Sequence, residues 1–150
     1  MSTSSRLYLA YHWVGTMMCF SAIVVFSSNK FANPRAVLLC ILAFALSASA
    51  SYILTVSYLK KLESWYSLSS IGTIRDFGMC VGVIMLGLFA YVIFEISYYG
   101  WDNAIKSPVK ESKIILAVWC FISAKYAFTI FWLGRKYFRN LSDTRLFLEE

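Results

Sequence analysis

Four long apolar runs, separated by short polar segments, dominate the pattern of the chain. They cover about residues 7–27, 36–58, 77–98 and 114–133. Each is close to the roughly 20 residues that cross the hydrocarbon core of a bilayer as a helix. The runs lack the alternation of apolar and polar residues that is typical of membrane β-barrel strands. The pattern therefore predicts an all-α membrane protein, with four transmembrane helices in a single domain over residues 1–150.

Composition supports a membrane protein and narrows its partners. Apolar residues make up 59% of the chain and charged residues 15%, whereas soluble domains have roughly 45–50% and about 25%. The aromatic content of 18% excludes a disordered chain. A net charge of +6 favours a lipid surface and anionic cargo before nucleic acid. We therefore expect a lipid bilayer as the surroundings and no nucleic-acid partner.

Lysine and arginine residues near the ends of the runs predict the orientation of the chain. The side that would hold the N-terminus carries eight of them: Arg6, Lys60, Lys61, Arg75, Arg135, Lys136, Arg139 and Arg145. The other side carries five: Lys30, Arg35, Lys106, Lys110 and Lys113. Because cytosolic segments carry the excess of positive charge, we expect both termini, including a tail at 134–150, to be cytosolic.

Two prolines predict helix boundaries. Asn33-Pro34 should break the chain before the second span, and Ser107-Pro108 has the residue types of an N-cap and first-turn proline for the fourth. The first run is too long and aromatic for a cleaved signal peptide. We therefore expect it to remain as a span.

Lys125 is the outstanding charged residue, because it lies about 12 residues into the fourth run. That places it roughly 18 Å along a helix, near the middle of a bilayer. A lysine there costs about 2.5–3.5 kcal/mol, so intramembrane charges are functional candidates by default. Its helical neighbours include Phe121, Phe128, Thr129 and Trp132. A cation among aromatic rings suits a flat, anionic, apolar ligand; the alternatives are a structural ion pair or a lysine that snorkels.

Other polar residues of the runs have ordinary structural interpretations. Gly78 and Gly82 form a GxxxG pair that predicts close helix packing. Glu95 is expected to pair with an outer lysine, or with Lys125 if the helices are offset. His12 favours a hydrogen-bonded interface residue over a ligand. Four cysteines, one in each run, are expected to behave as small apolar residues: Cys19, Cys40, Cys80 and Cys120.

The fourth run resembles a helix of a known family over Val118–Phe128, VWCFISAKYAF. The animal heme-responsive-gene family of four-span haem transporters has Val-Trp-x-Phe-Ile-Ser-x-Lys-x-Ala-Phe there. Arg135-Lys136-Tyr137 is similar to the end of its Phe-Ala-Arg-Lys-Tyr tail motif, although Leu133 and Gly134 depart from the first two positions. In the first run, Ala10-Tyr11 and Phe20-Ser21 have the spacing seen in the family. The resemblance covers nearly the whole chain.

The resemblance implies a haem permease that moves haem from the exoplasmic side to the cytosol, and no enzyme. Aligning the second helix puts Tyr52 where some members have histidine, and Tyr99 aligns with another histidine outside the third helix. Both tyrosines are therefore expected to ligate haem iron through oxygen. Propionates and ring would be held by Lys125, Arg135, Lys136, Tyr137, Phe121, Phe128 and Trp132.

Two other functions remain open at this stage. A tetraspan scaffold or sorting protein would carry no cargo and would need no charge at Lys125. A small membrane oxidoreductase would need paired histidines or a Cys-x-x-Cys pair, which the sequence lacks. The chain has no nucleotide-binding motif, so we expect passive or gradient-driven transport. The tail lacks clear sorting signals, which favours the plasma membrane over endosomes or lysosomes; a homo-oligomer stays open.

Overall fold

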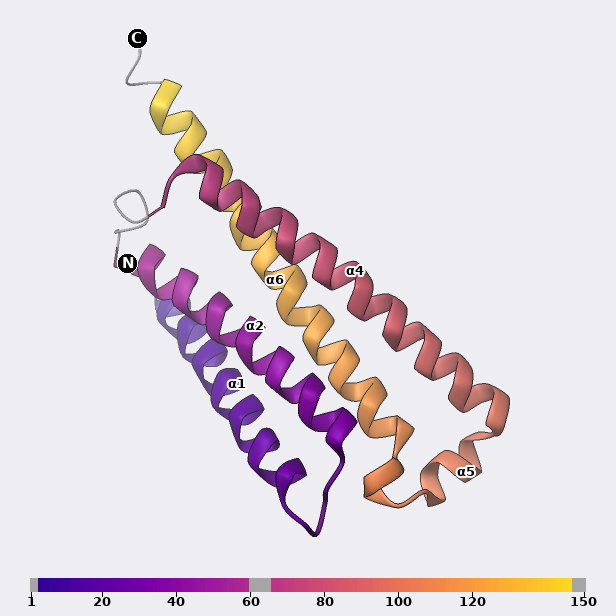
Figure 1. Ribbon diagram of the computed structural model, residues 1–150. Coiled ribbons are helices and arrows are strands. Elements are labelled where there is room, and N and C mark those ends of the chain that lie inside the picture. Colours follow the sequence, from indigo (N-terminus) through magenta and orange to yellow (C-terminus); the bar gives the residue numbers. More distant parts are fainter. Residues whose placement is uncertain (1–2, 60–65, 147–150) are drawn as a thin grey trace.

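The computed structural model describes residues 3–59 and 66–146, and all of their regular structure is helical (Figure 1). The elements are α1 (Thr3–Ser27), α2 (Pro34–Tyr58), α4 (Leu68–Tyr99), α5 (Trp101–Lys106), the short 3-10 helix η1 (Val109–Glu111) and α6 (Lys113–Leu146). Four of these helices are long and apolar enough to cross a membrane: α1, α2, α4 and α6. The predicted all-α fold with four transmembrane helices is therefore confirmed. Lys60 and Lys61, which entered the charge count, lie outside the described residues.

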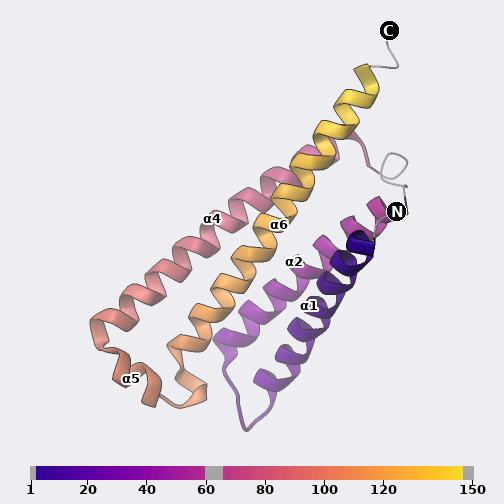
Figure 2. The same cartoon turned by 180° about the vertical axis from the view of Figure 1, so that it is seen from behind.

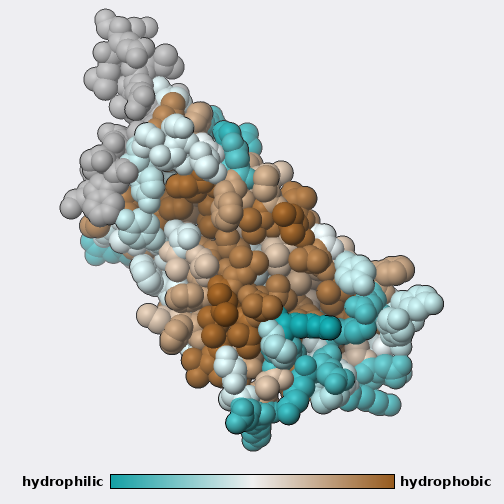
Figure 3. Space-filling view, viewed as in Figure 1, coloured by the Kyte–Doolittle hydropathy of each residue, from teal (hydrophilic) through white to brown (hydrophobic). Residues whose placement is uncertain are grey.

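The four long helices form an open bundle in which α6 is central. It packs against α4 on one side and α2 on the other, and α1 packs against α2. The start of α1 and the end of α6 lie at one end of the bundle, which we call the terminal end, and α5 lies at the opposite end, the α5 end (Figures 1 and 2). Figure 3 shows an apolar band across the middle of the bundle and polar residues gathered at the α5 end. This distribution fits a bilayer around the middle.

Local caps explain where the second and fourth spans begin. The side chain of Asn33 accepts a hydrogen bond from Ala36 N, and Pro34 occupies the first turn of α2, as predicted. The prediction for Ser107-Pro108 was wrong, because these residues precede η1 and not α6. The Ser112 hydroxyl instead accepts a hydrogen bond from Ile115 N at 3.4 Å. The start of the fourth span therefore lies five residues beyond Pro108.

Two helices extend well beyond their predicted apolar runs toward the terminal end. α4 begins at Leu68, where the Ser67 hydroxyl accepts from Ser70 N, and it includes the polar pair Arg75 and Asp76. α6 continues to Leu146, so much of the expected tail is helical. Hydropathy marks the apolar part of a helix only, whereas backbone hydrogen bonding continues into residues that face water or headgroups.

Glycines allow α4 and α6 to approach closely, which confirms the predicted role of the GxxxG pair. A Cβ atom at Gly78 would lie 2.8 Å from both the Ala127 carbonyl oxygen and the Phe131 nitrogen. A Cβ atom at Gly82 would lie 3.0 Å from the Phe128 ring. Nearer the terminal end, one at Gly134 would lie 2.9 Å from Arg75 Cβ. These contacts pack the segment of α6 that follows Lys125 directly against α4.

Candidate functional site

Lys125 lies on the surface of the bundle, in the space between α1 and α6. Its ammonium donates a hydrogen bond of 2.7 Å to the Tyr11 hydroxyl. The same nitrogen lies 5.0 Å from the ring centroid of Tyr11 and 5.1 Å from that of Tyr126. The Tyr126 ring thus holds the lysine by a cation–π contact, and Tyr11 holds it by a hydrogen bond. The aromatic neighbours of Lys125 come from α1 and from the next residue of α6.

Phe121 and Phe128, which were expected beside Lys125, face α4. The Phe121 ring packs 5.6 Å from that of Phe89 on α4, and Phe128 lies against Gly82. Thr129, another expected neighbour, uses its hydroxyl to bond the Lys125 carbonyl oxygen at 2.9 Å. The structure therefore does not bring the two phenylalanines together with the ammonium group.

Tyr126 fills the space between α6 and α1, which do not pack closely through their backbones. It is 4% exposed, and its hydroxyl reaches Gly15 so closely that a Cβ atom there would collide with it. Its ring lies 6.2 Å from that of His12. His12 is 2% exposed and also contacts the rings of Tyr8 and Tyr11, at 4.7 and 5.6 Å. An aromatic cluster thus closes the space between α1 and α6 next to Lys125.

A groove of about 800 Å³ begins one helical turn from Lys125 and runs toward the terminal end. Thr129 follows Lys125 by one turn of α6, and Tyr8 precedes Tyr11 by one turn of α1. The groove is walled by residues of three helices: Tyr8, Leu9, Leu54, Ser57, Tyr58, Thr129, Trp132, Leu133, Lys136, Tyr137 and Asn140. Its walls therefore combine aromatic rings, hydroxyl groups and one cation.

Basic residues continue from the groove toward the end of α6. A second hollow of about 380 Å³ adjoins the groove through shared residues and is lined by Trp132, Arg135, Lys136, Arg139 and Asn140. The guanidinium of Arg135 lies 5.7 Å from the Trp132 ring. Lys125, Trp132 and Lys136 are seven and four residues apart, so they follow one face of α6. The groove therefore carries an indole and one cation on the same face of α6 as Lys125, which lies one turn outside it.

Five of the nine residues predicted for the site gather along this groove. Trp132, Lys136 and Tyr137 line it, Arg135 lines the adjoining hollow, and Lys125 lies one turn beyond its inner end. The Tyr137 hydroxyl is hydrogen-bonded to Ser57 of α2. Sequence reasoning missed Tyr8, Ser57 and Tyr58, because nothing in the sequence signals which faces of α1 and α2 meet α6.

Tyr52 lies outside the groove. It is 43% exposed on α2 and is hydrogen-bonded to Tyr66, which precedes α4. Burial, with the neighbouring Tyr52 phenol, raises the pKa of Tyr66. The two phenols therefore form a neutral pair between α2 and the start of α4, separate from Lys125.

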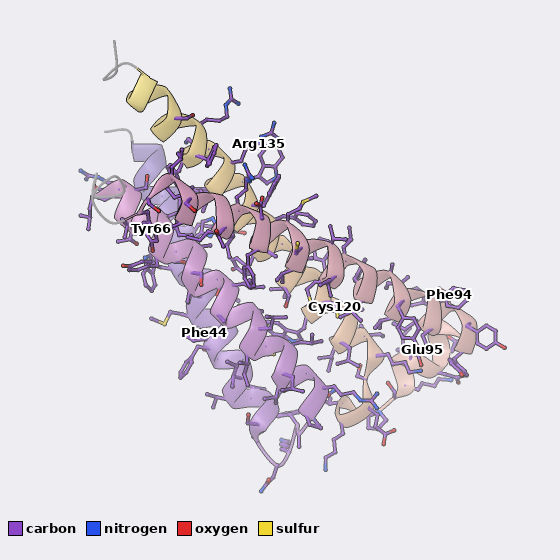
Figure 4. All side chains as sticks on the ribbon, turned by 45° about the horizontal axis from the view of Figure 1, so that its top comes forward. Phe44, Tyr66, Phe94, Glu95, Cys120 and Arg135 are labelled. Carbon is purple, nitrogen blue, oxygen red and sulfur yellow. The ribbon has the colours of Figure 1, made fainter. Side chains whose placement is uncertain are left out.

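Tyr99 lies at the α5 end. Lys113 donates a hydrogen bond of 2.6 Å to Glu95, and its nitrogen is 4.6 Å from the Tyr99 ring. This confirms the expected pairing of Glu95 with an outer lysine. Figure 4 shows Glu95 and Arg135 near opposite ends of the bundle. Tyr99 is thus separated from the groove by much of the length of the bundle.

Metal-ligating side chains do not cluster within the described part of the chain. Cys19, Cys40 and Cys120 are buried and Cys80 is exposed, all as free thiols. Over residues 3–59 and 66–146, no three side chains of histidine, cysteine, aspartate or glutamate gather where they could hold a metal ion.

Comparison of the chain with protein-family models, curated proteins and solved structures found no match.

Proposed function

We propose that the protein is a transmembrane transporter that moves haem from the exoplasmic side of a membrane to the cytosol. The observation that carries the proposal is the groove between α1, α2 and α6. Its volume of about 800 Å³ lies within the roughly 300–1,000 Å³ of small-molecule sites. Four of the residues that line it are aromatic: Tyr8, Tyr58, Trp132 and Tyr137.

The chemistry of haem matches both parts of this surface. The macrocycle is flat and apolar, so aromatic rings can pack against its faces. Its two propionates are anionic, and Lys136 lines the groove while Arg135 and Arg139 line the adjoining hollow. Charge-assisted hydrogen bonds of this kind are about twice as strong as neutral ones. Phenol oxygen can ligate ferric haem iron, and three groove residues carry it.

Lys125 supports movement of the cargo along α6. Its partner in the structure is the neutral hydroxyl of Tyr11, at 2.7 Å. A propionate is a stronger acceptor for an ammonium than a phenol. Haem arriving at Lys125 would therefore displace Tyr11 and then pass to Trp132 and Lys136, about two and three turns further on. Binding at each position must be modest, because the cargo has to leave again.

Orientation and compartment are part of the proposal. With both termini cytosolic, the groove opens in the cytosolic half of the membrane and the α5 end faces outward. The groove is then the site from which haem leaves. We propose the plasma membrane as the location, with endosomal and lysosomal membranes as the alternative.

Haem-dependent growth tests the proposal. Haem-deficient cells that express the protein should grow at low external haem, and Lys136→Gln should reduce that growth. Lys110→Gln is the matched control, because Lys110 is an exposed lysine at the α5 end, outside the groove. Loss of rescue with Lys136→Gln alone, at equal membrane abundance, supports the groove. Absence of any rescue by the wild type would contradict haem transport and favour a scaffold.

A further inference from the structure

Another hollow, which we call the α5-end hollow, lies between α4, α5 and α6. Its volume is about 300 Å³, at the lower end of the roughly 300–1,000 Å³ of small-molecule sites. All the residues that line it are apolar or aromatic, and they include Phe89 and Ile93 of α4, Trp101 of α5, and Val118 and Phe121 of α6. The rings of Phe89 and Phe121 lie 5.6 Å apart. The hollow can therefore hold the apolar part of a ligand, but not its anionic groups.

The end of α4 explains how Trp101 comes to line this hollow. Gly100 follows α4 with a φ of 92°, a backbone conformation that favours glycine, so the chain turns sharply there. α5 then contacts both α4 and α6 at this end of the bundle (Figure 1). The indole of Trp101 remains about half exposed, as do the side chains of Val118 and Phe121. The α5-end hollow is therefore open to the surroundings of the bundle.

The exposed side chains of α6 connect the α5-end hollow with Lys125 and with the groove. Between Lys113 and Trp132, a segment that the structure describes in full, the exposed residues are Val118, Phe121, Lys125 and Trp132. Their spacings of three, four and seven residues put them on one face of the helix. Val118 and Phe121 line the α5-end hollow, and Trp132 lines the groove. The two hollows therefore lie on the same face of α6, with Lys125 between them.

This face carries an aromatic residue followed by a lysine four positions later, twice. Phe121 precedes Lys125, and Trp132 precedes Lys136. Residues four apart are neighbours on a helix surface. The second pair follows the first by 11 residues, which is about three turns or roughly 16 Å along the axis. Each hollow is thus followed, toward the terminal end, by a lysine on the same face.

We propose that the α5-end hollow is a second binding site for the planar, dianionic cargo and the one that it reaches first. The proposal rests on the function proposed above. The apolar edge of the macrocycle lies in the hollow against Phe121, and the propionates reach Lys125, whose hydrogen-bond partner in the structure is the neutral Tyr11 hydroxyl. A lipid chain would fill the hollow equally well, but it carries no anionic group for Lys125 to bind. The charge of Lys125 therefore favours the cargo.

The repeated pair means that the cargo keeps its orientation as it moves. At both sites the ring lies toward the α5 end and the carboxylates toward the terminal end. Movement between the sites is a shift of roughly 16 Å along the exposed face of α6. It needs no rotation of the macrocycle and no closed pore, because one side of the path is the bilayer itself.

Zinc protoporphyrin, a fluorescent dianionic analogue of haem, tests the second site by its binding. The full chain is purified in detergent as Lys136→Gln, which weakens the groove and leaves the α5-end hollow to bind the probe. Adding Val118→Trp fills the hollow and should weaken this remaining binding about tenfold or more. The matched control adds Val83→Trp, because Val83 is an exposed valine of α4 outside the hollow. Equal affinities of the two double variants would overturn the proposal and leave a lipid chain as the occupant.

A second pair of variants covers the case in which Val118→Trp loses its helical circular dichroism. Phe121→Leu removes the ring that packs on Phe89 and keeps an apolar side chain. In the Lys136→Gln chain it should weaken binding about two- to tenfold. Phe94→Leu is its control, since Phe94 is an exposed phenylalanine of α4 outside the hollow. The same affinity with both changes would overturn the proposal.

Growth of haem-deficient cells separates this proposal from the proposed function. In the otherwise unchanged chain, Val118→Trp should reduce growth at low external haem several-fold at equal surface abundance, and Val83→Trp should not. Full growth with Val118→Trp would overturn the second site and leave haem transport standing. A wild type that neither supports growth nor binds zinc protoporphyrin would contradict haem as the cargo, and this proposal with it.

Discussion

The Lys125 ammonium donates a 2.7 Å hydrogen bond to the hydroxyl of Tyr11, a residue 114 positions away in the sequence. This side-chain contact joins α6 to α1, two helices whose backbones do not pack closely against each other. A charge in the span that is held by a neutral partner is available to an anion. The partnership therefore explains how one lysine can be tolerated within a membrane span.

Neutralising Lys125 should abolish most uptake while leaving the protein inserted. Lys125→Met removes the ammonium and keeps a helix-forming side chain of similar length. Hydrogen bonds to charged groups are worth about 1.5–3 kcal/mol, so we expect haem uptake to fall about tenfold or more. Uptake is measured in haem-deficient cells with surface abundance matched, and Lys110→Met serves as the control. Unchanged uptake would favour the scaffold.

Gly15 should be intolerant of any side chain, because Tyr126 occupies the space that a Cβ atom would need. Gly15→Ala forces the phenol away, and overpacking of this kind costs about 1–3 kcal/mol. Thermal unfolding in detergent measures the loss. Adding Tyr126→Phe removes the colliding oxygen, and the nearest remaining ring carbon, Cζ, lies 3.3 Å from the new methyl group. The double variant should therefore recover most of the stability; no recovery would place the clash elsewhere.

The spans and their closest packing were predictable because both depend on local properties. A run of about 20 apolar residues fixes a span whatever its neighbours are. The GxxxG spacing of Gly78 and Gly82 similarly marks a flat helix face. The start of α4 and the end of α6 were not predictable from hydropathy, since both extend into polar sequence, such as Arg75 and Asp76 in the first turns of α4.

The candidate site was predictable only for the residues that α6 contributes. Lys125, Trp132 and Lys136 follow from helical spacing along one chain segment. Their partners Tyr8, Tyr11 and Tyr58 depend on which helices are neighbours, and hydropathy gives no order for four similar spans. The unknown order of the helices also explains why Phe121 and Phe128 were wrongly expected beside the Lys125 ammonium. They share the helix of Lys125 but face α4.

The α4–α6 contact predicts different effects of an alanine substitution at two glycines of α4. Gly78→Ala would bring a methyl group 2.8 Å from backbone atoms of Ala127 and Phe131, which cannot move independently. We expect a loss of about 1–3 kcal/mol. Gly87→Ala meets nothing within 4 Å, and should be neutral or stabilise the helix by up to about 1 kcal/mol. Equal unfolding temperatures for the two variants would contradict the close approach of α4 and α6.

The basic residues at the end of the groove should matter for release of cargo into the cytosol. Changing Arg135 and Lys136 together to Gln removes two cations beside the proposed exit, so a cytosolic haem reporter should respond several-fold less. These residues also contribute to orientation, so cysteine labelling from each side of the membrane must show unchanged topology. A full response from a correctly oriented variant would exclude the exit role.

The ligand of the iron should be a phenol of the groove. Tyr8, Tyr58 and Tyr137 line the groove together with Trp132, whereas Tyr52 is hydrogen-bonded to Tyr66 outside it. Each tyrosine-to-phenylalanine change removes one oxygen and keeps the ring, so packing should survive. We expect at least one of the three groove variants to alter the visible spectrum of the haem-loaded protein and to lower uptake, and Tyr52→Phe to leave the spectrum unchanged. The reverse result, with a spectral change in Tyr52→Phe alone, would support the alignment of Tyr52 with the histidine of the resembling family and would move the iron to the α2–α4 side of the bundle.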